Sequence, residues 1–217
     1  MKTWKQLFIR HGWMLAELED NRFNCNKETE ANLQFLLECL GKANVKFVFN
    51  QGVLILLEKA IEEEKWIESI DFPERGRGEG LWFQPGQESP KVRELDVYIS
   101  GIVRQLNRLG FYTAGSCDGH GRRGAHVMLT EECNIEWLNV MLLGLGIKRV
   151  YWRENRNCYH LQLPFSQNEL LDLAEKMSLI DKSWLGQGVD FIREQLFYLQ
   201  LEQLLMIPGV SGKNFII

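Results

Sequence analysis

The feature that most constrains the fold of this chain is an order of elements that occurs twice between residues 89 and 163. Each copy has a helical pattern of apolar residues that ends at glycine, followed by two short alternating segments. These segments are 90–109, 111–117 and 125–130 in the first copy, and about 131–143, 147–153 and 158–163 in the second. Helices repeat about every 3.6 residues and half-buried strands every two. The order is therefore helix, strand, strand, taken twice.

A further helix is expected at 170–177, where Ser166 and Glu169 match a capping box, and a last long helix at about 189–206. These patterns predict an α+β fold with an αββαββα core, an antiparallel sheet and a C-terminal helix. An internal duplication of the αββ unit would explain the repeat. Chance similarity between two amphipathic αββ units would explain it equally well.

The chain divides by composition into three parts. Residues 1–69 are expected to form a helical N-terminal region, because Leu33–Leu40 and Val53–Trp66 carry apolar residues at helical spacing. Residues 70–90 are rich in glycine and proline and are expected to form a linker or loop. Residues 91–217 are expected to form the α+β domain that carries the site.

Composition excludes several classes of protein. The 25 basic and 29 acidic residues give a net charge of -4, which excludes a histone-like or polybasic membrane binder. The longest apolar run, Val53 to Leu57, is far shorter than the roughly 18 residues of a membrane span, so no membrane contact is expected. Five cysteines form no CxxC pair, which fits a reducing compartment, and we expect a cytoplasmic protein. The sequence is compatible with a monomer or an oligomer.

Alternation divides each strand pair into a packed face and an open face. In both halves a histidine lies near the start of the returning strand, second in AHVMLT and second in YHLQLP, so His126 and His160 are expected at equivalent places on one open face. Tyr151, Arg153 and Cys158 are expected on the same face. This concentration of polar and metal-binding side chains is the main functional signal in the chain.

Cys117, His120 and His126 have the spacing C-x2-H-x5-H. Thiolate and imidazole are good zinc ligands, and three protein ligands leave a position for water or substrate. We therefore expect a zinc site at these residues, with Asp118 or His160 as general base. The alternative is a structural role, in which Cys117 is a small buried residue and the histidines bind backbone groups.

Arg122 and Arg123 lie in the glycine-rich turn DGHGRRG and predict an anion site. With Tyr151 and Arg153 they would bind the anionic part of a substrate, and such a site would not require a metal. The favoured function is a small zinc-dependent hydrolase acting on a phosphate-bearing or nucleotide-like substrate. The alternatives are a non-catalytic module that binds an anion or RNA on the same face, and a structural interaction protein.

The string FYTAGSCDGH is similar to the Ser-Cys-x-Gly signature of the tRNA wybutosine-synthesis methyltransferase family. The similarity covers residues 111–120, and His120 stands where that signature would lead us to expect a basic residue of another type. This resemblance implies an RNA-modifying enzyme as a further alternative.

Overall fold

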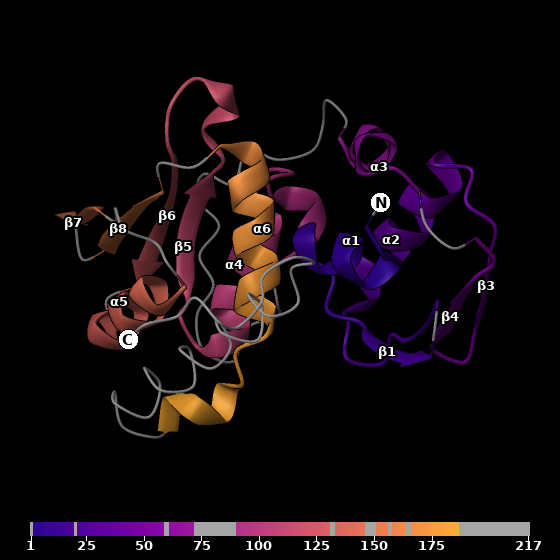
Figure 1. Cartoon of the computed structure of the whole chain (residues 1–217), viewed down its shortest axis with the longest axis horizontal. Coiled ribbons are helices and arrows are strands. Elements are labelled where there is room, and N and C mark those ends of the chain that lie inside the picture. Colours follow the sequence, from indigo (N-terminus) through magenta and orange to yellow (C-terminus); the bar gives the residue numbers. More distant parts are fainter. Residues whose placement is uncertain are drawn as a thin grey trace, which may run out of the picture. The chain divides into compact units, whose positions relative to one another are not determined.

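The computed structural model confirms the α+β class, with helices and two antiparallel four-stranded sheets (Figure 1). It describes residues 2–19, 21–58, 61–71, 90–130, 133–145, 151–155, 158–163 and 166–186. The chain divides into two compact units, Met1–Cys133 with Arg149–Leu179, and Asn134–Lys148 with Ile180–Ile217. Among the described residues, no helix is both long enough and apolar enough to cross a membrane.

The region 1–69 contains a sheet as well as helices, so the prediction of a purely helical region was wrong. Its elements are α1 (Trp4–Arg10), β1 (Ala16–Glu19), β2 (Arg22–Asn24), α2 (Glu30–Lys42), β3 (Phe47–Asn50), β4 (Val53–Leu56) and α3 (Glu63–Ile70). The sheet order is β1-β2-β4-β3. Gln51 and Gly52 have φ angles of 48° and 75°, which is the geometry of a two-residue hairpin turn. That turn makes Val53 the start of a strand rather than of a helix.

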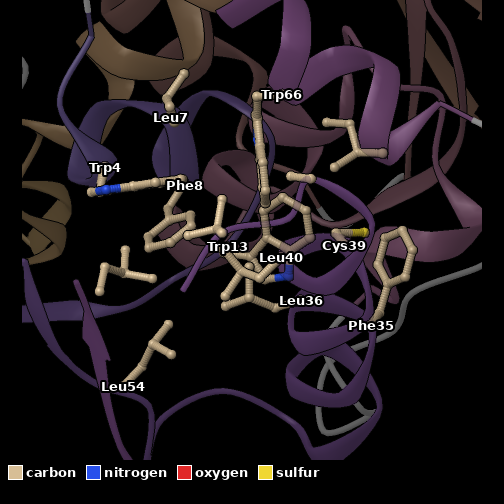
Figure 2. Packing of buried hydrophobic residues seen from close by; sticks show 14 of the residues in the cluster. Trp4, Leu7, Phe8, Trp13, Phe35, Leu36, Cys39, Leu40, Leu54 and Trp66 are labelled. Carbon is tan, nitrogen blue, oxygen red and sulfur yellow. The ribbon is translucent and has the colours of Figure 1, made fainter. Parts of the chain in front are cut away.

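The core of this region is a cluster of aromatic and aliphatic side chains (Figure 2). Trp4 and Trp66 meet edge to face with ring centroids 5.9 Å apart, and Phe8 meets Phe23 at 5.1 Å. Edge-to-face pairs add stability beyond the burial of their area. The cluster thus holds α1 and α3 together and packs them against β2.

The order predicted after residue 90 is confirmed. The elements are η1 (Val92–Glu94), α4 (Ser100–Leu109), β5 (Thr113–Cys117), η2 (Gly119–Gly121), β6 (Ala125–Thr130), α5 (Ile135–Gly144), β7 (Tyr151–Asn155), β8 (Cys158–Leu163), α6 (Gln167–Ser178) and η3 (Lys182–Gly186). The second sheet has the order β5-β6-β8-β7. The predicted helix at 189–206 and most of the predicted linker, 72–89, lie outside the described residues.

The predicted division of β6 into two faces is also confirmed. Ala125, Val127 and Leu129 are buried, whereas His126 and Met128 between them are half-buried. The helix predicted to begin at Pro90 begins instead at Ser100. This difference leaves residues 95–99 outside any helix. One member of the candidate site lies among them.

Gly101 allows α4 to approach α1 and α6, which both contact it within the first unit. A Cβ atom at Gly101 would lie 2.3 Å from the carbonyl oxygen of Arg10 and 2.7 Å from Cβ of Ala174. Both distances are shorter than any normal contact, so the close packing of the three helices requires glycine here.

Gly101→Ala should therefore force the helices apart and lower the free energy of unfolding by about 1–3 kcal/mol. Gly41→Ala in α2 is the matched control, because its added Cβ meets no described atom within 4 Å. The control should leave the free energy of unfolding unchanged or raise it by up to about 1 kcal/mol, because alanine has a higher helix propensity than glycine. Denaturant unfolding measures both, and equal effects at the two positions would contradict the close-packing argument.

A buried ion pair joins α4 to the N-terminal region. Nη2 of Arg104 donates to both carboxylate oxygens of Glu28, at 2.6 and 2.8 Å, and both side chains are almost fully buried. The remaining donors of Arg104 bind backbone carbonyls, Nε that of Gly12 at 2.9 Å and Nη1 that of Pro90 at 3.2 Å. Burial lowers the pKa of Arg104, and the attraction of Glu28 opposes this shift.

Glu28→Gln should lower the free energy of unfolding by about 3–5 kcal/mol, because it leaves the Arg104 charge buried without a counterion. Glu38→Gln is the matched control: Glu38 pairs with Lys42 and Arg93 on the surface. Exposed pairs contribute little, so the control should change stability by less than about 1 kcal/mol. A Glu28→Gln protein as stable as the control would show that the buried pair does not hold α4.

A second ion-pair cluster joins α1, α3 and α6. Arg10 donates to Glu63 through Nε at 2.6 Å, and it also pairs with Asp172 and Glu175 of α6. Burial acts to raise the pKa of Glu63, but hydrogen bonds and attraction from His11 and Arg10 outweigh it and lower that pKa to about 2.

A carboxyl group with a lowered pKa stabilises the fold above its unfolded pKa, and this contribution is lost as the pH falls through the folded value. The Tm difference between the wild type and Glu63→Gln should therefore be constant above pH 4.5 and shrink as the pH approaches about 2. The exposed Glu62 provides the control substitution, Glu62→Gln. Thermal unfolding across this pH range measures the effect, and a pH-independent difference would contradict it.

Candidate metal centre

The glycine-rich turn after β5 folds back on the end of the strand. The side chain of Asp118 accepts the backbone N–H of His120 at 2.9 Å, and His120 adopts a left-handed conformation with φ of 49°. Gly119 has φ of 81°, and a Cβ there would lie 3.2 Å from the backbone of Gly124. The turn therefore needs glycine at 119 and holds His120 back toward Asp118.

Four side chains meet at this turn: Asp96, Cys117, Asp118 and His120. One potential ligand atom from each lies within 4.8 Å of the ligand atoms of the other three. Nδ1 of His120 lies 3.2 Å from Oδ1 of Asp118, and its Nε2 lies 3.9 Å from Oδ2 of Asp96. Asp96, Cys117 and Asp118 are buried, and His120 is exposed. This group could hold a metal ion.

Asp96 joins the group from the non-helical segment before α4. Its Oδ2 accepts the backbone N–H of Asp118 at 3.1 Å, which fixes the carboxylate beside the turn. Sequence reasoning missed this residue because it lies far from Cys117 along the chain. The sequence signal that could have identified Asp96 is an acidic residue between the apolar neighbours Leu95 and Val97, all three of which are buried. Buried carboxylates are rare unless they are paired or bound to metal.

The sulfur of Cys117 accepts two polar contacts. The backbone N–H of Gly119 lies 3.4 Å from Sγ, and Nη2 of Arg123 lies 3.7 Å from it. The Cys117 sulfur is therefore held toward the turn, where it could act as a metal ligand.

Asp118 is one of several groups that affect the pKa of Tyr98. Burial raises the pKa of Tyr98, and the nearby carboxylates of Asp71, Asp118 and Glu63 raise it further. The tyrosine hydroxyl is therefore held in its neutral form beside the group.

His126 does not belong to this group, although the sequence predicted it as a ligand together with Cys117 and His120. It pairs with Cys117 across the β5–β6 ladder, but its ring lies against His160. The two ring centroids are 6.4 Å apart and the planes differ by 11°. Asp96 and Asp118 take the place expected for His126. The prediction that His126 and His160 share one sheet face is confirmed.

The predicted substrate residues fall into two sets. Arg122 and Arg123 are exposed in the turn beside the group. Tyr151 and Arg153 lie on β7, paired with Gln162 and His160 respectively, and their side chains are outside the described part of the structure.

Comparisons with protein-family models, with curated proteins and with solved structures find no match for this chain. The resemblance to the wybutosine-synthesis methyltransferases therefore stays a similarity over residues 111–120. The residues of the site itself must carry any functional argument.

Proposed function

We propose that Asp96, Cys117, Asp118 and His120 bind one zinc ion and that the chain is a zinc-dependent hydrolase of a phosphate-bearing substrate. The observation that carries this proposal is the meeting of these four ligand atoms within 4.8 Å, three of them on buried residues. Two buried carboxylates are costly to hold close together without a cation.

The donor set favours zinc over other common cations. Magnesium and calcium prefer oxygen ligands alone, whereas zinc accepts sulfur, nitrogen and oxygen together. Cys117 and His120 thus point to zinc.

The exposed side of the group supports a catalytic role. A bound zinc ion would polarise a phosphoryl oxygen and acidify an attacking water. Arg122 and Arg123, exposed in the same turn, would bind the phosphate oxygens. Asp118 would accept the proton that the attacking water loses.

His160 is poorly placed for the role of general base. It lies on β8, two strands from Cys117, and two strand spacings amount to about 10 Å. A general base must reach its proton directly or through one water. We therefore assign the proton to Asp118 and not to His160.

A structural zinc site is the second candidate, because four protein ligands can close a tetrahedral site and leave no open position. Two measurements separate the candidates: cobalt substitution reports the coordination of the metal, and hydrolysis of p-nitrophenyl phosphate reports activity. The hydrolase proposal predicts an open or exchangeable coordination position and zinc-dependent hydrolysis.

The full chain purified with zinc should contain one zinc per molecule by elemental analysis. Cys117→Ser should weaken zinc binding by at least about tenfold, because it replaces a thiolate with a poor ligand. Cys133→Ser is the matched control, since Cys133 is also buried and lies outside the group. Chelation should abolish hydrolysis, and added zinc should restore it.

Zinc-free protein, or equal zinc content in both cysteine variants, would refute the metal site. Stoichiometric zinc with closed coordination and no hydrolysis would refute the hydrolase and leave a structural site.

A further inference from the structure

The central strands of the second sheet place His126 and His160 symmetrically. The β6–β8 ladder runs from the pair Ala125 and Leu163 to the pair Thr130 and Cys158. A two-fold axis through the pair Val127 and Leu161, near the middle of this ladder, carries His126 onto His160. The two histidines are thus diagonal neighbours on one face.

Their imidazole rings lie with nearly parallel planes on the sheet face that also carries Cys117 of the candidate metal centre. The planes differ by only 11°, and both residues are half-buried, so each keeps an exposed part. Nε2 of His160 is buried and has no hydrogen-bond partner among the described residues. A buried polar atom of this kind commonly marks the position of a bound group.

The strand register links this surface to the metal centre. Cys117 pairs directly with His126, and His160 pairs with Arg153 on the far side. One face of the sheet therefore carries, strand by strand, the metal group, two imidazoles and an arginine position. Neighbouring strands lie about 4.8 Å apart, so the nearer imidazole, that of His126, is one strand spacing from Cys117 of the metal group.

We propose that the His126–His160 pair is the platform on which the base of a nucleotide substrate stacks while its phosphate lies at the metal centre. This inference rests on the proposed function and names its substrate class. Imidazole rings stack with bases, as other aromatic side chains do on sheet surfaces. In a chain with net charge -4, Arg122 and Arg123 would draw the phosphate to the turn, and the base would then lie over the rings.

Adenosine 5′-monophosphate and ribose 5-phosphate are the probes, since they share the sugar phosphate and differ in the base. Calorimetry on the zinc-loaded full chain should show about tenfold tighter binding of the nucleotide, because stacking on an aromatic ring favours the base by that order. His126→Leu and His160→Leu should remove most of this preference. His126→Phe should keep it, because phenylalanine retains a flat ring without metal-binding nitrogen atoms. Circular dichroism confirms that each variant is folded.

Zinc content separates this inference from the proposed function. A stoichiometric zinc protein that binds both probes equally, or that loses its preference in His126→Phe, overturns the platform and leaves the metal site. A zinc-free protein that still prefers the nucleotide supports the platform and refutes the hydrolase. Much tighter binding of single-stranded oligoadenylate than of the mononucleotide would replace the nucleotide with RNA and overturn the inference.

Discussion

The buried ion pair between Arg104 and Glu28 determines where α4 lies in the first unit. The Glu28 carboxylate also accepts the backbone N–H of Met14 and the side-chain amide of Asn32, so both of its oxygens are satisfied. Asn32 in turn binds Pro90 and Val92, at the start of the segment that leads to α4. A buried pair with this many hydrogen bonds holds the helix in one position, because any shift would leave a buried charge without its partner.

The position of α4 in turn fixes part of the candidate metal centre, because Asp96 lies just before the start of the helix. The carbonyl oxygen of Asp96 accepts the N–H groups of Ile99 and Ser100, and the Ser100 hydroxyl donates to the carbonyl of His11. Asp96 is therefore held by the same turn that starts the helix, and its carboxylate reaches the N–H of Asp118. A member of the candidate metal centre is thus oriented by packing that lies outside the glycine-rich turn.

The sequence predicted those parts of the molecule that depend on local patterns. The αββαββα order followed from helix-ending glycines and strand alternation, and the shared face of His126 and His160 followed from strand parity. The N-terminal sheet escaped prediction because its strands have three or four residues, too few to show a period, and β1 is exposed throughout. Leu33–Leu40 was correctly placed in a helix, α2, because that pattern spans two full turns.

The candidate site also has a part that local sequence patterns predicted and a part that they did not. Cys117, Asp118 and His120 are neighbours in one turn, so their spacing was informative. Asp96 comes from another segment, and its place depends on how α4 packs, which no local pattern records. His126 was assigned to the metal by proximity in the hairpin, but strand pairing fixes only the backbone positions, and its ring lies against His160 instead.

The left-handed backbone of His120 sets the stability of the turn against the presence of its side chain. A residue with a side chain at φ of 49° loses about 1 kcal/mol of folding free energy that glycine would keep. The flanking positions 119 and 121 are glycine and also have positive φ. Glycine at 120 would therefore stabilise the turn, but it would remove the exposed imidazole from the candidate metal centre.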